Sequence, residues 1–170
     1  MYKYLLYFLI FSFLGWCAEV VFYVIRSGKF VNRGLARGPV CPIYGVGITL
    51  SALLLRSVEN FVLLALLAMS VATIVELTVG AMTHSMLGVR LWDYTKEKGN
   101  ILGYVCPRFS LIWGVACASV IKLLPILDRV IELLYNPFWY ALSIVLLAII
   151  IVDEKSVMIG GKGTMGKIKS

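Results

Sequence analysis

Five long apolar segments set what this chain can fold into. They cover residues 4–25, 40–55, 61–82, 109–124 and 138–152. Hydrophobic residues make up 61% of the sequence, which is more than one soluble core of this length can bury. A helix needs about 20 apolar residues to cross a bilayer. The sequence therefore predicts an all-α integral membrane protein with about five transmembrane helices.

The second, fourth and fifth segments are short for a full crossing. Such a segment can recruit interfacial residues at its ends, lie where the bilayer thins, or turn back as a re-entrant loop. For residues 40–55, the sequence leaves both a full crossing and a re-entrant turn open.

A short motif, Gly-x-x-x-Gly-x-Val-Cys-Pro, occurs twice and indicates a duplication. Its copies are Gly34, Gly38, Val40, Cys41, Pro42 and Gly99, Gly103, Val105, Cys106, Pro107. We interpret the pattern as an internal parallel repeat, with repeat one at 4–55, repeat two at 61–124 and an extra span at 138–152. Residues 1–154 would form the membrane domain, and residues 155–170 a basic, flexible cytoplasmic tail.

One carboxylate lies in the first segment and one in the third, Glu19 and Glu76. Each is about fifteen residues from the start of its segment, or about 22 Å along a helix, so we expect similar depths. A charge in hydrocarbon is expensive and needs a specific partner or function. We predict that the pair lines a proton or cation pathway, with Arg33 or Arg90 as counter-charges. Alternatively, both glutamates lock helices together through salt bridges or hydrogen bonds.

The basic residues predict the orientation in the membrane, because Lys and Arg accumulate in cytoplasmic loops. With the N-terminus outside and the C-terminus cytoplasmic, most of the 16 Lys and Arg residues face the cytoplasm. The exceptions are Lys3, Arg56, Lys122 and Arg129. Topology and anionic lipid thus account for the net charge of +7, and we expect the lipid bilayer, not nucleic acid, as the partner of this charge.

Two unusual loops, residues 28–47 and 84–108, carry the remaining candidate residues. Glycine and proline in loop one exclude a regular helix there and leave backbone amides free for an anionic group or a partner's acidic surface. The sequence is equally consistent with loop one forming an ordered re-entrant turn that satisfies its own backbone groups. Loop two reads as an interfacial segment in which Asp93 could pair with an Arg of the other loop. The candidate gate or docking residues are Asn32, Arg33, Gly34, Gly38, Pro39, Cys41, Pro42, Tyr44, Gly45, Trp92, Asp93, Tyr94, Asn100 and Gly103.

Catalytic, metal and cofactor sites are not predicted. The chain has one histidine and no Cys-x-x-Cys pair, which disfavours both zinc binding and nucleophilic catalysis. Residues 161–167 match the Gly-x4-Gly-Lys pattern of a phosphate-binding loop. Ile168 follows, however, where that loop needs a Ser or Thr to bind magnesium. Between Pro125 and Pro137, the pattern predicts a short amphipathic helix on the outer surface, with Asp128 on its polar side.

At these residues the chain resembles the CmpB-like family of ABC-transporter permeases, also labelled type IV. The resemblance rests on Gly15-Trp16 with Glu19, Asn32-Arg33-Gly34, Gly38-Pro39, Cys41-Pro42-Ile43-Tyr44-Gly45, Trp92-Asp93-Tyr94 with Asn100, and Trp113-Gly114. It implies a bacterial inner-membrane protein and a transport component. Because the chain has no nucleotide-binding domain, transport would need a separate ATPase, and so few spans favour a homodimer or a partner permease.

We therefore expect a membrane permease-like component of a small-molecule or ion transport system, with no enzymatic activity of its own. The alternative is a non-transporting adaptor or sensor that binds a soluble partner through its cytoplasmic loops. A less favoured alternative is a lipid-modifying enzyme that uses Asp93, Glu76 and arginines at the membrane face.

Overall fold

The computed structural model describes residues 2–32, 34, 37–133 and 136–169, with side chains in the last helix described up to residue 159. Over this part the chain is all-helical, as the sequence predicts. The five helices are α1 (Tyr2–Ser27), α2 (Pro42–Leu55), α3 (Phe61–Leu87), α4 (Pro107–Leu133) and α5 (Pro137–Lys169).

Helices α2 and α4 both begin at the proline of the duplicated motif. Pro42 and Pro107 suit the first helical turn because a proline there gives up no intrahelical hydrogen bond. This corrects one sequence prediction: Tyr44 and Gly45, expected in an irregular loop, lie within α2. A proline in the first turn of a helix marks where the helix begins and does not interrupt it.

Helix α3 has defined ends at both sides. The Asn60 side chain accepts a hydrogen bond from the backbone N–H of Leu63 at 3.0 Å, which satisfies one of the free amides of the first turn. At the other end, Gly88 has φ +62° and its N–H bonds the His84 carbonyl. A glycine with this conformation terminates a helix at low cost.

Helix α4 continues through Pro125 to Leu133. The short surface helix predicted between the two prolines is therefore wrong, because Pro125 removes one backbone hydrogen bond without ending the helix. Asp128, expected on a polar outer face, is only 6% exposed.

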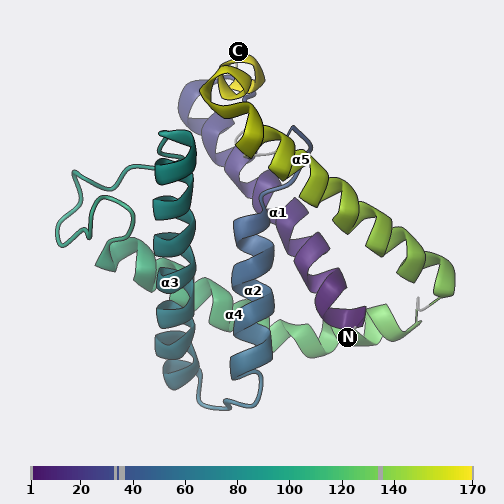
Figure 1. The fold of residues 1–170 in the computed structure, drawn as a ribbon. Coiled ribbons are helices and arrows are strands. Elements are labelled where there is room, and N and C mark those ends of the chain that lie inside the picture. The colour runs from purple at the N-terminus through teal and green to yellow at the C-terminus, as the bar shows by residue number, and fades with distance from the viewer. Residues whose placement is uncertain (1, 33, 35–36, 134–135, 170) are drawn as a thin grey trace.

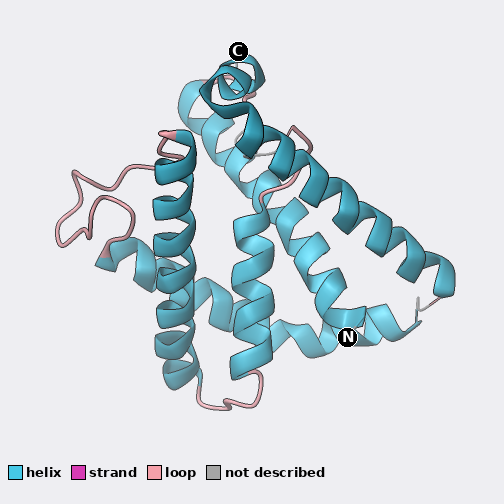
Figure 2. Cartoon of the chain, viewed as in Figure 1, coloured by secondary structure: helices cyan, strands magenta, loops and turns pink. Residues whose placement is uncertain are grey.

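The two termini lie at opposite ends of the molecule, and α4 runs across the other helices (Figure 1). Helices α1, α3 and α5 rise from the N-terminal end of the molecule, α2 returns, and α4 passes behind α3 and α2. The loops before α2 and before α4 both follow the upper ends of rising helices, while the α2–α3 connection lies at the opposite end (Figure 2).

Close contacts join the helices in pairs, α1 with α2 and α3 with α4. Gly45 faces Ser12 and the Phe8 carbonyl of α1, and Gly114 faces Met69 and the Ala65 carbonyl of α3. Small residues let helix backbones approach closely, which drives association where no water is displaced. Helix α5 packs more sparsely, against α1 and α3.

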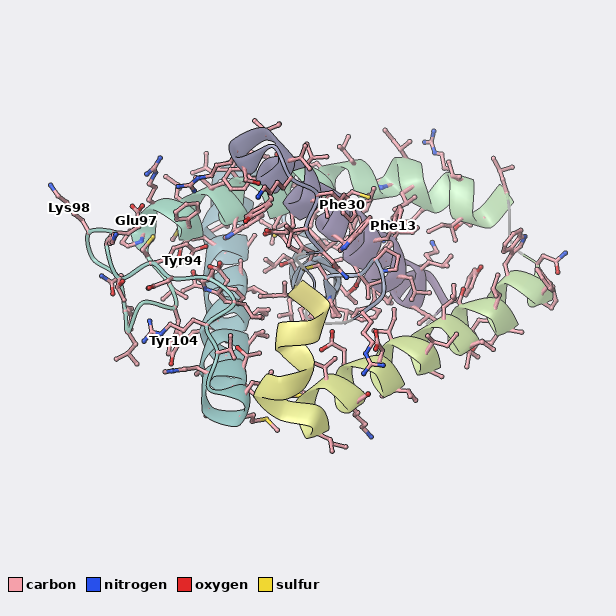
Figure 3. All side chains as sticks on the ribbon, turned by 90° about the horizontal axis from the view of Figure 1, so that it is seen from above. Phe13, Phe30, Tyr94, Glu97, Lys98 and Tyr104 are labelled. Carbon is pink, nitrogen blue, oxygen red and sulfur yellow. The ribbon has the colours of Figure 1, made fainter. Side chains whose placement is uncertain are left out.

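Within the described residues, three helices, α1, α3 and α4, are long and apolar enough to cross a membrane. Helix α2 is apolar but has only 14 residues, or about 21 Å. Large apolar side chains are exposed over much of the surface, among them Phe22, Ile74 and Ile126, each more than 60% exposed. Figure 3 shows two further examples, Phe13 and Phe30. Such a surface suits lipid, so the chain is a membrane protein.

The backbone of α5 runs to Lys169, through the segment that the sequence predicts as a flexible tail. Continuing the helix satisfies backbone carbonyls up to its last turn within the chain. The division into a membrane domain and a tail stays a prediction, as does the internal repeat.

Candidate functional site

Tyr44 joins the first predicted carboxylate to the second helix. Its hydroxyl donates a hydrogen bond of 2.6 Å to Oε1 of Glu19. The ring occupies space that the missing side chain of Gly15 leaves free, since a Cβ there would overlap it. Gly15 therefore leaves room for the Tyr44 ring, and Tyr44 bonds Glu19, which lies one helical turn after Gly15.

Trp113 on α4 connects this pair to the second carboxylate. Its indole ring lies edge-on to the ring of Tyr44, with centroids 5.2 Å apart. Its Nε1 donates a hydrogen bond of 3.1 Å to Oε1 of Glu76 on α3. Glu19 and Glu76 thus share one chain of side chains, Glu19–Tyr44–Trp113–Glu76, which we call the glutamate chain.

Glu76 is the more enclosed of the two carboxylates, at 7% exposed. Its Oε1 also accepts from the Tyr94 hydroxyl at 3.3 Å, and Tyr94 stacks on Phe109 with ring centroids 4.6 Å apart. Burial raises the pKa of Tyr94, so its hydroxyl stays a hydrogen-bond donor at neutral pH. Oε2 of Glu76 is buried and bonds no residue that the structure describes.

Loop one is held in place by side chains from α1 and α5. Oδ1 of Asn32 accepts from Trp16 Nε1 at 2.8 Å and from the backbone N–H of Gly34 at 3.1 Å. Asp153 on α5 accepts from the backbone N–H groups of Arg37 and Gly38 at 2.8 and 3.1 Å. The backbone N–H groups of Gly34, Arg37 and Gly38 are therefore bonded within the chain. Arg33, predicted as a counter-charge, lies outside the described residues.

Loop two is a compact unit built on its aromatic residues. Trp92 Nε1 donates to the Tyr104 carbonyl at 2.7 Å, and the backbone N–H of Tyr94 bonds the Gly103 carbonyl at 2.9 Å. The Asn100 side chain bridges the carbonyls of Thr95 and Glu97 and the N–H of Gly103. Through Tyr94, this loop reaches the glutamate chain.

The predicted partners of the charged loop residues are corrected by the structure. Asp93 faces Arg90 of its own loop, with Oδ1 and Nη1 3.6 Å apart, whereas the sequence suggested an Arg of the other loop. Arg90 also donates to the Leu102 carbonyl at 3.2 Å, and among the described residues its salt bridge is to Asp93, not to Glu76. The Thr95 N–H donates to Asp93 and holds the pKa of Asp93 below its ordinary value.

A second polar cluster, which the sequence did not predict, lies at the opposite end of the bundle. Asp128 on α4 accepts a hydrogen bond from Tyr7 on α1 and forms a salt bridge with Arg56 at the end of α2. Arg56 also donates to the Tyr7 hydroxyl at 3.0 Å. The sequence did contain one indication of this cluster, because Asp128 is a charged residue within an apolar segment.

The glutamate chain offers oxygen atoms and aromatic donors within a helix bundle. Carboxylates in such settings exchange protons or bind cations, and tyrosine and tryptophan orient them. The described residues contain no group of three or more His, Cys, Asp and Glu side chains that could hold a metal ion.

A family model described as Putative ABC-transporter type IV matches residues 6–157. The chain belongs to this family. The match covers all the residues of the glutamate chain and both loops, as the resemblance of their motifs predicts. No curated protein and no solved structure gives a match. The type IV family name supports a transporter-type membrane protein and leaves the substrate open.

Proposed function

We propose that this type IV family protein is the permease-like transmembrane component of a transport system for a small molecule or ion, energised by a separate ATPase. The observation that carries the proposal is the state of Glu76. One of its oxygens is buried without a partner in the described part of the chain, although leaving a carboxylate oxygen unsatisfied costs about 1–3 kcal/mol or more. A bound proton, cation or polar solute would offset that cost.

The link between Glu19 and Glu76 supports one shared pathway. The two carboxylates come from different helices and meet Tyr44 and Trp113 between them. A structural lock would need only one hydrogen bond for each glutamate. Carboxylates that face one another inside a helix bundle mark the paths of ions and protons in membrane proteins, and here a ring contact of 5.2 Å between Tyr44 and Trp113 separates the two hydrogen-bonded glutamates.

Orientation and partners follow from the charge pattern and the family. We propose a bacterial inner-membrane location with the N-terminus outside, so that both loops face the cytoplasm. A separate ATPase would then contact this side, and a homodimer would complete the pathway. The candidate loop residues, among them Pro39, Cys41 and Asn100, would serve as the gate or the docking surface.

Flux measurements in liposomes test the proposal. The purified protein is reconstituted with a pH-sensitive dye inside, and proton and potassium gradients are imposed on wild type, Glu76→Gln and Glu19→Gln. Glutamine keeps the acceptor oxygen, so both variants should stay folded while flux falls at least tenfold. Glu132→Gln is the matched control, because its carboxylate is 64% exposed at the surface.

Two results count against the pathway. Equal flux in wild type and Glu76→Gln would remove Glu76 from transport. Absence of flux in every form, together with loss of thermal stability in both glutamine variants, would assign the glutamates a structural role and favour the adaptor function.

A further inference from the structure

The tip of loop two has a backbone conformation that its residues do not favour. The Tyr104 N–H bonds the Ile101 carbonyl at 3.0 Å and closes a tight turn. Its central residues, Leu102 and Gly103, have φ of +53° and +73°. Positive φ at both central positions is the pattern of a type I′ turn, which is usually filled by Asn-Gly or Gly-Gly.

Leu102 is the one non-glycine residue with positive φ in the described chain. A leucine gains nothing there from local hydrogen bonding, and its Cβ makes the conformation unfavourable. Its side chain is 71% exposed, and that of Ile101 beside it is 55% exposed. The turn therefore exposes two apolar side chains, Ile101 and Leu102. At position 102, asparagine would be more stable than leucine.

The base of this turn is rigid. Tyr104 and Val105 are buried, at 9% and 1% exposed, and the Ile101 N–H bonds the Val105 carbonyl at 2.9 Å. The Asn100 side chain caps the Gly103 N–H at 3.0 Å. Ile101 and Leu102 are thus exposed on a turn whose base is buried and hydrogen-bonded.

Positive charge surrounds the tip. Glu97 lies 3.7 Å from Arg108, and Asp93 faces Arg90. Both acidic residues of the loop therefore have cationic neighbours. Lys96 and Lys98 are exposed and have no salt-bridge partner among the residues described. In Figure 3, Lys98 points away from the bundle at the outer edge of the loop.

The position of the loop between two candidate spans indicates what covers it. It joins the end of α3 to the start of α4, two helices long enough to cross a membrane. Figures 1 and 3 both show it extending outward from the bundle beyond α3. A loop that links two membrane spans lies at the bilayer surface, where apolar side chains enter the acyl boundary and lysines meet headgroups.

We propose that Ile101 and Leu102 insert into the bilayer interface and that Lys96 and Lys98 bind anionic phospholipid headgroups there. The loop that holds Tyr94 against Glu76 is thereby anchored to lipid. This anchor is independent of what the protein transports.

Crosslinking from the turn identifies its neighbour directly. p-Benzoylphenylalanine is introduced at position 102 of the full-length protein in nanodiscs of phosphatidylcholine and phosphatidylglycerol, and the adducts are identified by mass spectrometry after illumination. Phospholipid adducts are expected. Adducts to a second copy of the chain, or no adduct at all, would overturn the proposal.

Thermal melts separate lipid anchoring from a role inside the protein. In nanodiscs, phosphatidylglycerol should raise the melting temperature of wild type and of Leu102→Met, and Leu102→Asn should lose most of that rise. In detergent without lipid, Leu102→Asn should melt no lower than wild type, because asparagine accepts positive φ. Lys96→Ala with Lys98→Ala should abolish the preference for phosphatidylglycerol over phosphatidylcholine. If phosphatidylglycerol raises the melting temperature of Leu102→Asn as much as that of wild type, Leu102 does not contact lipid. The same follows if Leu102→Asn loses as much stability in detergent as it does in nanodiscs.

Discussion

Tyr44 on α2 donates a hydrogen bond of 2.6 Å to Glu19 on α1. This bond fixes one carboxylate of the glutamate chain while the Tyr44 ring contacts Trp113, which holds the other. The site therefore depends on a phenol hydroxyl for its first link and on ring packing for its second.

Tyr44→Phe separates these two contributions. The ring contact with Trp113 persists, and the hydrogen bond to Glu19 is lost, which should lower the free energy of unfolding by about 1–2 kcal/mol. Denaturation in detergent, followed by circular dichroism, measures the change. Tyr4→Phe is the control, because the Tyr4 hydroxyl bonds no residue in the described part of the chain. Equal stability of the two variants would mean that the Glu19 bond adds nothing.

Gly15→Ala should disturb the same link from the other side. A Cβ at Gly15 overlaps the Tyr44 ring, so the ring must move away from Glu19. Overpacking of this kind costs about 1–3 kcal/mol. Gly47→Ala on α2 is the matched control, because nothing lies within 4 Å of its added Cβ and alanine favours the helix. A Gly15→Ala protein that melts like the Gly47→Ala protein would contradict the packing at this contact.

Sequence reasoning found the two carboxylates because a charge within an apolar helix is visible without a structure. Their equal depth was an estimate from position alone, and the link between them was not predicted. Trp113 was noticed only as part of a family motif, since nothing in its spacing shows that α4 brings it to Glu76. Side-chain contacts between distant helices depend on packing, which the one-dimensional pattern does not contain.

The loops show the same limit. Proline and glycine predicted irregular structure, and this holds for residues 28–32, 34 and 37–40, but Pro42 begins α2 and Pro125 lies within α4. A proline ends a helix or starts one according to which neighbours supply the missing hydrogen bonds. Asp93 was expected to pair with an arginine of loop one, and the fold of loop two places it beside Arg90 instead.

Loop two should loosen in acid through Asp93. The Thr95 N–H and Arg90 hold the pKa of Asp93 below its ordinary 3.8, so the carboxylate stabilises the folded loop. A lowered folded pKa gives stability that is complete above the unfolded pKa and is lost as the pH falls below it toward the folded pKa. Hydrogen exchange of the Thr95 amide should therefore accelerate as the pH falls below about 4, beyond the intrinsic pH trend of exchange. Asp93→Asn should remove this acid dependence, and an unchanged profile in that variant would exclude Asp93 as its source.

The cluster around Asp128 should make the largest single contribution of the polar groups outside the glutamate chain. Asp128 is 6% exposed, and Arg56→Ala would leave its charge with the Tyr7 hydroxyl and with the Lys3 ammonium, 3.7 Å away. Removing one member of a buried ion pair costs about 3–5 kcal/mol, and the partial exposure of Arg56 together with the remaining Lys3 reduces the expected loss to below about 3 kcal/mol.

A double-mutant cycle tests this pairing. Arg56→Met combined with Asp128→Leu should be more stable than the sum of the two single losses predicts, since apolar residues then replace both charges. Glu97→Gln in loop two is the surface control: its carboxylate lies 3.7 Å from the exposed Arg108, and the loss of this pair should cost under about 1 kcal/mol. Strictly additive losses at Arg56 and Asp128 would show that the two residues stabilise the bundle independently, and the salt bridge that joins α2 to α4 would then have no measurable role.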